Sequence, residues 1–230
     1  MLLSSKPALW LALITSGEFG FERDVIEKST IDEMVVPPFE GFTTADRREI
    51  DSLFTSLVRV SKDAWHNIDA WVARLYGLKS RDLDVISDTL DYSLPFTDNR
   101  KSAQDVPTSE AVRLFCSTLN SELEAWGSRF GKRLIAEQVP LSSVSPWRTL
   151  KLCVHDALEE CSKTASQPWF EFFKAADHMA ASEIIFEDSL SKCIWIGRLD
   201  QARYWTQTRA RLVAREMIWE HPNFLANGRE

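Results

Sequence analysis

Apolar side chains recur every three or four residues along most of the first half of the chain, which is the spacing of helices with one buried face. The predicted helices cover residues 3–16, 30–35, 44–58, 65–75, 80–91 and 109–126. Thr44 is expected to cap the helix that follows it, with Arg47 in the place where a capping box would have Glu. The two prolines at 37 and 38 interrupt regular structure before it.

After Gly131 the sequence changes to short apolar runs that are typical of strands. The predicted strands cover residues 132–139, 148–155, 182–188 and 192–199. A short polar turn joins the last two strands as a hairpin, and a helix over about 200–220 follows. The predicted fold class is therefore α+β, with a helix-rich first half and a small antiparallel sheet closed by a C-terminal helix.

Residues 96–107 are polar and show no apolar period, so they are the predicted linker. The expected organisation is a helical region over 1–95 and an α+β region over 108–230 that ends in an arginine-rich helix. A chain of 230 residues is long enough for one large domain or two small ones with real hydrophobic cores.

The net charge of −7 argues against a free-standing nucleic-acid binder, because phosphate contacts need clustered Lys and Arg. The charge is uneven, however, since residues 1–100 carry 11 basic and 17 acidic side chains. The C-terminal segment is locally basic, and its arginines are Arg198, Arg203, Arg209, Arg211, Arg215 and Arg229. A local basic patch can matter more than the total charge.

The cysteines show no close pairing, which is typical of reduced thiols in a cytoplasmic protein. They are Cys116, Cys153, Cys161 and Cys193. Residues 8–14 are apolar but too few to span a bilayer, and charged residues follow closely. A buried helix is therefore favoured over a signal peptide, and we expect a cytoplasmic protein without a membrane partner.

Pro37 and Pro38, followed by Phe39, can be compared with the motif by which adenine methyltransferases hold a flipped base. That motif needs a polar first residue to accept a hydrogen bond from the target amino group, and Val36 cannot do so. No glycine-rich turn follows an early strand to hold a nucleoside cofactor. We therefore expect no catalytic residue and no cofactor in this chain, and we interpret the prolines as a turn.

Two other kinds of site are weakly indicated. Cys153 and His155 should point to one face of a strand, but with Cys161 they do not complete a convincing zinc ligand set, so we expect no metal. A nuclease would need acidic residues and a lysine around a metal, and its candidates here are Glu183, Glu187, Asp188 and Lys192. Their spacing does not match such a site, so a solvated turn is the preferred interpretation.

The C-terminal segment has the most informative pattern. Four of its long polar side chains are spaced by four residues and should share one helix face; they are Arg203, Gln207, Arg211 and Arg215. A basic stripe beside aromatic side chains suits phosphate and base contacts. The alternative, which residue types alone slightly favour, is a helix whose arginines pair with surface acids. It would pack inward the apolar side chains of Tyr204, Trp205, Leu212 and Trp219.

The segment from Leu199 to Arg211, with its Arg203-Tyr204-Trp205 core, resembles the arginine-rich C-terminal end of large N6-adenine DNA methyltransferases. These enzymes belong to restriction–modification and phage-defence systems. Residues 3–23 are similar to a segment of their target-recognition region, which also has a Pro-Pro element shortly after it. Residues 75–90 are similar to the family's tail. The resemblance consists of short segments that together span most of the chain.

The resemblance implies a bacterial protein that helps to position double-stranded DNA. The family's cofactor-binding and catalytic motifs lie upstream of these segments and have no counterpart here. The resemblance therefore implies that a partner, which is a methyltransferase or other effector subunit, binds S-adenosylmethionine and transfers the methyl group. The other possibility that it implies is that catalysis has been lost. The candidate DNA-binding residues are Ser16, Gly17, Gly20, Arg23, Arg203, Tyr204, Arg209, Arg211 and Arg215.

The acidic first half favours a second interpretation. In it the chain is a protein-interaction scaffold whose apolar first helix docks on a partner, and it has no contact with DNA. Both interpretations predict a partner protein, and neither assigns catalysis to this chain alone.

Overall fold

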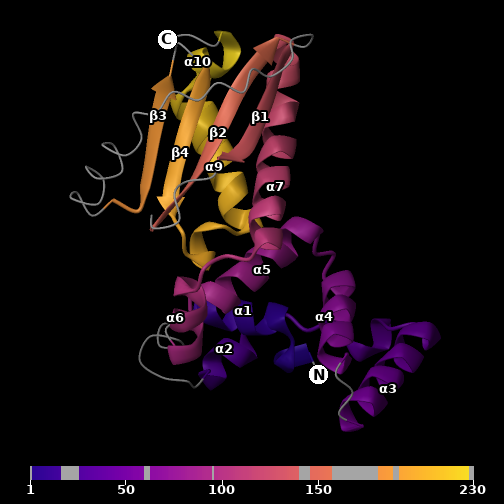
Figure 1. The fold of residues 1–230 in the computed structure, drawn as a ribbon. Coiled ribbons are helices and arrows are strands. Elements are labelled where there is room, and N and C mark those ends of the chain that lie inside the picture. Colours follow the sequence, from indigo (N-terminus) through magenta and orange to yellow (C-terminus); the bar gives the residue numbers. More distant parts are fainter. Residues whose placement is uncertain are drawn as a thin grey trace. The chain divides into compact units, whose positions relative to one another are not determined.

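A computed structural model describes residues 2–16, 26–59, 63–94, 96–139, 146–156, 181–188 and 192–227. The chain divides into two compact units, Met1–Lys101 and Ser102–Glu230. The described part of the first unit is built from helices, whereas the second combines helices with an antiparallel sheet (Figure 1). The fold is therefore α+β with a helix-rich first half, as the sequence predicts.

The first unit consists of short helices close to the predicted positions. They are η1 (Leu2–Ser4), α1 (Lys6–Thr15), α2 (Lys28–Asp32), η2 (Phe39–Gly41), α3 (Thr44–Val58), α4 (Ala64–Leu75) and α5 (Ser80–Tyr92). The Ser5 hydroxyl accepts a hydrogen bond from the Ala8 N–H at 3.4 Å and so caps α1. Gly77 follows α4 with a φ of 64°, a conformation that glycine adopts without steric cost and that stops the helix.

The predicted cap of α3 is wrong by one residue. Thr43, not Thr44, is the N-cap, and its hydroxyl accepts a hydrogen bond from the Asp46 N–H at 3.2 Å. The Asp46 carboxylate in turn accepts one from the Thr43 N–H at 2.8 Å. Asp46 is therefore the acidic member of the capping box, and the hydrogen bonds that its carboxylate accepts from the Thr43 hydroxyl and N–H hold its pKa below the ordinary value.

Two separate apolar clusters hold the first unit together. The cluster between α3 and α4 buries Leu53, Ile68, Trp71 and Val72. The cluster between α5 and α1 buries Ile86, Leu90 and Leu94 against the half-buried Leu9, Trp10 and Leu13. Each cluster is small, so the described residues of the first unit pack in two small cores and not in one large core.

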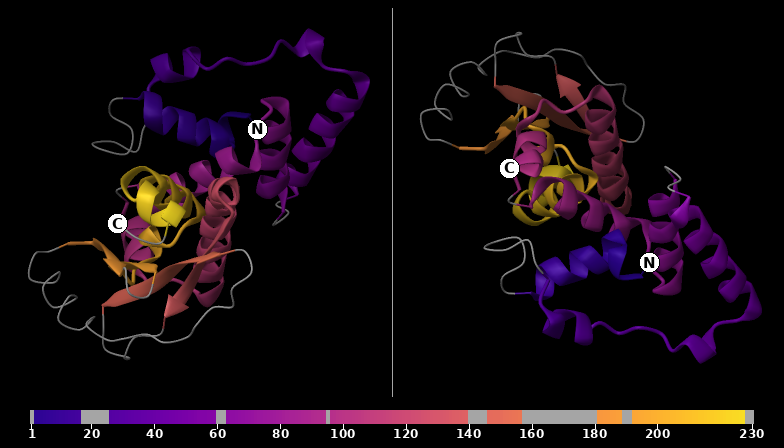
Figure 2. Two further views of the ribbon diagram at one scale, coloured as in Figure 1. Left: turned by 90° about the horizontal axis from the view of Figure 1, so that it is seen from above. Right: turned by 90° about the horizontal axis from the view of Figure 1, so that it is seen from below.

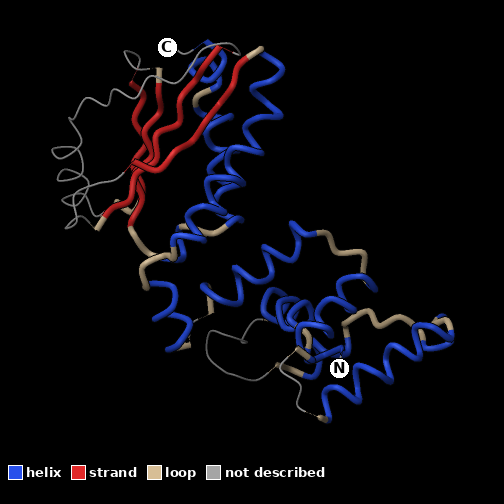
Figure 3. The backbone as a smooth tube through the Cα atoms, turned by 45° about the vertical axis from the view of Figure 1, so that its right-hand side comes forward, coloured by secondary structure: helices blue, strands red, loops and turns tan. Residues whose placement is uncertain are grey.

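The second unit is a four-stranded antiparallel sheet in the order β1-β2-β4-β3 (Figures 1 and 3). Its strands are β1 (Lys132–Val139), β2 (Trp147–Asp156), β3 (Glu183–Asp188) and β4 (Cys193–Leu199). Its helices are α7 (Ser109–Gly127), η3 (Ser128–Phe130), η4 (Ala202–Tyr204), α9 (Gln207–Glu220) and α10 (Pro222–Asn227). The predicted hairpin is confirmed, because β3 pairs antiparallel with β4.

Helices α7 and α9 cover the same face of this sheet (Figures 1 and 2). The main core of the molecule lies between them and the strands. The residues of α7 that the sequence assigns to a buried face are all buried there: Val112, Phe115, Leu119 and Leu123. Opposite them the sheet contributes Leu150, Leu152, Ile194 and Ile196, none of which is exposed to solvent.

The predicted linker contains regular structure. Helix α6 covers Thr97–Gln104, and the boundary between the two units falls within it. Ala103 is buried, and the Asp105 carbonyl accepts a hydrogen bond from the Ala202 N–H at 2.8 Å. The segment is polar because most of α6 faces solvent, and polarity alone does not distinguish such a helix from a loop.

Candidate functional site

Helix α9 is the element that carries most of the predicted DNA-binding arginines. It begins after Thr206, whose hydroxyl accepts a hydrogen bond from the Arg209 N–H at 3.2 Å. The side of α9 that faces the sheet and α7 is made of Ala210, Val213, Ala214 and Met217, all buried. These four residues fix the rotation of the helix and therefore decide which side chains face solvent.

Arg203 is not part of α9, contrary to the prediction of one helix from about residue 200. It lies in η4, and α9 begins at Gln207. Its guanidinium lies over the ring of the half-buried Tyr204, with 4.9 Å between the guanidinium carbon and the ring centroid. Arg203 and Tyr204 therefore form a stacked pair in the segment before α9, and they are not part of a basic stripe along that helix.

Arg211 is half-buried and lies between two helices. Its Nε lies 3.6 Å from the Glu122 carboxylate on α7. This ion pair joins the two helices that cover the sheet. We therefore assign Arg211 to the packing of α9 and remove it from the set of arginines open to a ligand.

Arg209 and Arg215, in contrast, are exposed. Within the part of the chain that the structure describes, neither guanidinium forms an ion pair. Leu212 and Trp219 occupy the same solvent-facing side of the helix, since the four positions lie three to four residues apart. We call these four residues the outer face of α9: Arg209, Leu212, Arg215 and Trp219.

The inward packing that the alternative interpretation expects is only half correct. Trp205 is fully buried, its Nε1 donates a hydrogen bond to the Leu199 carbonyl at 2.9 Å, and its ring packs 5.1 Å from that of Phe115. Leu212 and Trp219, however, are 46% and 86% exposed. The sequence does contain the signal that separates them, because the small buried residues of α9 repeat at helical spacing on the opposite side.

A largely buried ion pair between Arg198 and Glu183 holds the segment that precedes α9. Arg198 on β4 is buried, and its Nη2 donates a hydrogen bond to Glu183 on β3 at 3.0 Å. Its Nη1 donates to the Tyr204 carbonyl at 3.1 Å, which ties the sheet to η4. Burial lowers the pKa of Arg198, and the neighbouring Glu183 carboxylate opposes that shift. The η4 segment before α9 is thus bound to the sheet through the buried guanidinium of Arg198.

The C-terminal end of α9 is more acidic than its beginning. Burial raises the pKa of Glu216, with further contributions from the negative charges of Glu183 and Glu220. His221, just after the helix, is paired with Glu187 on β3. The unpaired positive charge of the outer face is therefore concentrated at Arg209 and Arg215.

The remaining predicted contacts lie near the N-terminus. Ser16 is buried and forms the C-cap of α1, with its N–H donating to the Ala12 carbonyl at 2.9 Å. Gly17, Gly20 and Arg23 lie outside the described residues. These candidates belong to the first unit, whereas the outer face of α9 belongs to the second.

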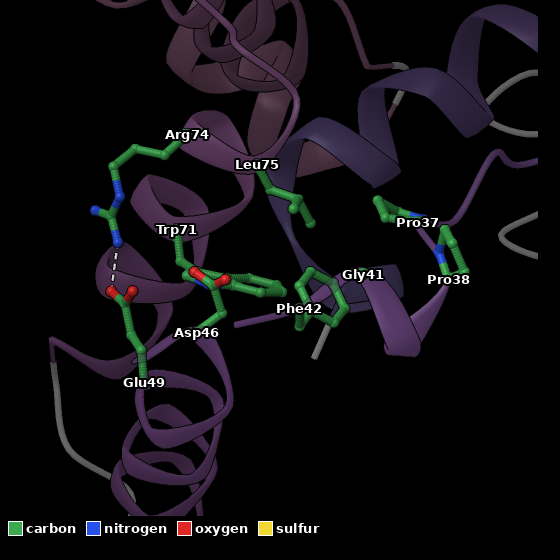
Figure 4. A pocket seen from close by; sticks show the side chains of 9 residues that line it. All are labelled: Pro37, Pro38, Gly41, Phe42, Asp46, Glu49, Trp71, Arg74 and Leu75. Carbon is green, nitrogen blue, oxygen red and sulfur yellow. Dashed lines mark hydrogen bonds and ion pairs between the residues drawn. The ribbon is translucent and has the colours of Figure 1, made fainter. Parts of the chain in front are cut away.

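The Pro-Pro element lines a hollow of about 390 Å³ in the first unit (Figure 4). Besides Pro37 and Pro38, the lining residues are Gly41, Phe42, Asp46, Glu49, Trp71, Arg74 and Leu75. Glu49 and Arg74 pair with each other, and Asp46 serves the cap of α3. Its charged groups are therefore already engaged in structural contacts.

The residues considered for a nuclease site are also engaged in structure. Glu183 and Glu187 pair with Arg198 and His221, on the sheet face that packs against the helices. Asp188 ends β3 and does not lie in the turn. Glu187 and Asp188, as consecutive strand residues, point to opposite faces, so the carboxylates do not converge on one metal.

Neither a metal site nor a membrane-spanning helix is found within the described residues, and the chain matches no known protein. Within the described ranges, no group of three His, Cys, Asp or Glu side chains is arranged to hold a metal ion. None of the helices placed by the structure has both the length and the apolar content needed to cross a bilayer. No family model matches the chain, and no match was found among curated proteins or solved structures.

Proposed function

We propose that this chain is a non-catalytic DNA-recognition or accessory subunit and that the outer face of α9 contacts the DNA. The observation that carries the proposal is Trp219, which is 86% exposed on an otherwise well-packed helix, one turn from Arg215. Leu212 is exposed on the same side of the helix, and an exposed apolar patch, unlike a single exposed side chain, indicates an interaction surface. Trp and Arg together are the residues most often found at the centre of binding surfaces.

The chemistry of the outer face fits a nucleic-acid backbone. Two guanidiniums that have no acidic partner among the described residues can each neutralise a phosphate, and an exposed indole can pack on a sugar or a base. Arg209 also lies in the first turn of α9, where the unpaired backbone N–H groups add positive potential. The arginines would position the DNA, and Trp219 would add contact area.

The rest of the proposal follows from the resemblance to N6-adenine DNA methyltransferases. In it the chain acts in the bacterial cytoplasm, beside a methyltransferase or other effector subunit that holds S-adenosylmethionine. Double-stranded DNA is the shared ligand of the two subunits.

The test is a binding titration of a labelled DNA duplex with the full chain, followed by fluorescence anisotropy between about 50 and 200 mM salt. We expect Arg209→Ala and Arg215→Ala each to weaken binding and to reduce the slope of log K against log salt by about 1. Trp219→Ala should weaken binding about tenfold with little change in slope.

Arg113→Ala is the matched control, because Arg113 is an exposed arginine of the same unit that pairs with Glu110. It should leave the salt slope unchanged. The proposal fails if no salt-sensitive binding appears, either for the chain alone or together with a protein that co-purifies with it.

A second candidate function, a protein-interaction scaffold, is favoured by the exposure of Leu212 beside Trp219. An apolar pair of this kind is what a protein partner would cover. In that case Leu212→Ala and Trp219→Ala would release a co-purified protein, binding would depend little on salt, and DNA would not bind.

A further inference from the structure

Cys153 on β2 and Cys193 on β4 face each other across the two central strands of the sheet, where β4 begins. They are partners in the strand register, and their sulfur atoms lie 2.6 Å apart. Both side chains are buried, with 5% and 1% of their surfaces exposed. The structure has them as two thiols.

Their position follows from the alternation of side chains along the strands. Leu152 and Val154 on β2, and Ile194 on β4, point to the helices and belong to the main core. Cys153 and Cys193 therefore lie on the opposite face. Cys116, on α7, belongs to the helix side of the sheet.

The backbone around the pair has the geometry that a cross-strand disulfide needs. The Val154 N–H donates to the Lys192 carbonyl at 3.0 Å, so the hydrogen bond lies beside the cysteines and not between them. Cys153 and Cys193 thus form a non-hydrogen-bonded pair, in which the Cα atoms are about 4.5 Å apart. That separation lies at the short end of the range found for disulfides, about 4.4 to 6.8 Å.

We propose that Cys153 and Cys193 are a redox-active pair that closes into a cross-strand disulfide when the protein meets a small peroxide oxidant. The strand register holds the two sulfurs together before any oxidation, so the bond can form without rearrangement of the backbone. A bond between β2 and β4 would fix their register, and β4 is the strand that leads to η4 and α9.

The reaction balances with hydrogen peroxide as the oxidant. One thiolate attacks a peroxide oxygen and breaks the O–O bond, which gives a sulfenic acid and, after proton uptake, one water. The second thiol loses its proton, and its sulfur attacks the sulfenic sulfur. The S–S bond forms, the S–O bond breaks, and the hydroxide leaves as a second water after it takes up that proton. The two thiols lose two electrons in total, and the peroxide gains them.

Cys116 offers an internal comparison. It is half-buried on α7, and burial raises the pKa of its thiol. It also lies on the other side of the sheet from the pair. Cys116 should therefore stay outside the link between Cys153 and Cys193.

The test treats the full chain with hydrogen peroxide and maps its disulfides by mass spectrometry of peptides prepared without reductant. We expect a single intramolecular link between Cys153 and Cys193, a loss of two thiols, and a mass decrease of two hydrogens. The oxidised protein should melt at a temperature higher by on the order of 10 °C, and dithiothreitol should reverse the shift.

Cys116→Ser is the matched control and should behave like the unchanged protein. Cys153→Ser and Cys193→Ser should each remove both the link and the melting shift, and circular dichroism of the reduced variants shows whether they fold. A link that joins either cysteine to Cys161, or oxidation to sulfinic acid without a link, would overturn the proposal. An unchanged melting temperature in a fully linked protein would overturn the role assigned to the bond in fixing the sheet.

Discussion

The charged residues of the second unit differ in function because they differ in how much water reaches them. Arg198 is buried, and both of its partners, Glu183 and the Tyr204 carbonyl, are fixed by the sheet and η4. Arg113 and Glu110 also form an arginine–glutamate ion pair, but theirs lies on the exposed surface of α7. An exposed pair contributes little to stability because water screens it, whereas a buried charge without its partner is costly.

We therefore expect Glu183→Ala to lower the free energy of unfolding by about 3 kcal/mol, because it leaves the guanidinium of Arg198 buried and uncompensated. Urea unfolding followed by tryptophan fluorescence measures this value. Glu110→Ala, which removes the exposed partner of Arg113, should cost less than about 1 kcal/mol.

The double variant Glu183→Leu, Arg198→Met separates the charge effect from the loss of packing. It should recover most of the stability lost in Glu183→Ala, because apolar side chains of similar volume fill the site without charge. If Glu183→Ala and Glu110→Ala lowered the free energy of unfolding equally, the assignment of Arg198 and Glu183 as a buried ion pair would be contradicted.

At the scale of the element, the position of α9 is set by the cap at its N-terminus and by the residues of its buried side. Its buried side is made chiefly of small residues, which let the helix lie close to the sheet and α7. The outer face is consequently set by the residues that cannot fit inward: the arginines, Leu212 and Trp219. The start of α9 is fixed by Thr206, which is itself buried.

Thr206→Ala should lower the free energy of unfolding by about 1 kcal/mol, because the Arg209 N–H loses its hydrogen-bond acceptor. The shift of the urea midpoint at constant slope measures the loss. Thr206→Ser keeps the hydroxyl and should stay within a few tenths of a kcal/mol of the unchanged protein. A loss as large for Ser as for Ala would mean that the methyl group of Thr206, and not the cap, stabilises α9.

At the scale of the whole molecule, the two units differ in how they are built and charged. The first unit has 12 basic and 17 acidic residues and two small clusters, whereas the second has 15 basic and 17 acidic residues and one large core. The second unit contains the whole sheet, both covering helices and the outer face of α9.

We expect a fragment of residues 102–230 to fold alone, with a single cooperative urea transition, because the main core lies entirely within it. If the proposed function is correct, this fragment should bind DNA with a salt slope within about 1 of that of the full chain. Residues 1–101 should bind DNA weakly or not at all, since their charge is more negative. Binding that requires both fragments would instead place part of the DNA surface in the first unit.

The local elements could be predicted from sequence because their causes are local. The buried face of α7 follows from helical apolar spacing and the strands β1 to β4 from short apolar runs, and the chain carries both patterns without reference to any distant residue. The prediction failed where polar residues form a helix, as in α6, and where the chain turns before α9. In both places short-range patterns of helix and loop are too similar to separate.

The candidate site could be predicted only in part. The sequence by itself determined that the C-terminal segment is a basic helix with aromatic neighbours, because residue type and helical spacing are written into it. Only the tertiary structure decided that Arg211 pairs with Glu122, that Trp205 is buried and that Trp219 is not. The reason is physical: the rotation of α9 is fixed by contacts with α7 and the sheet, and these residues lie tens of positions away along the chain.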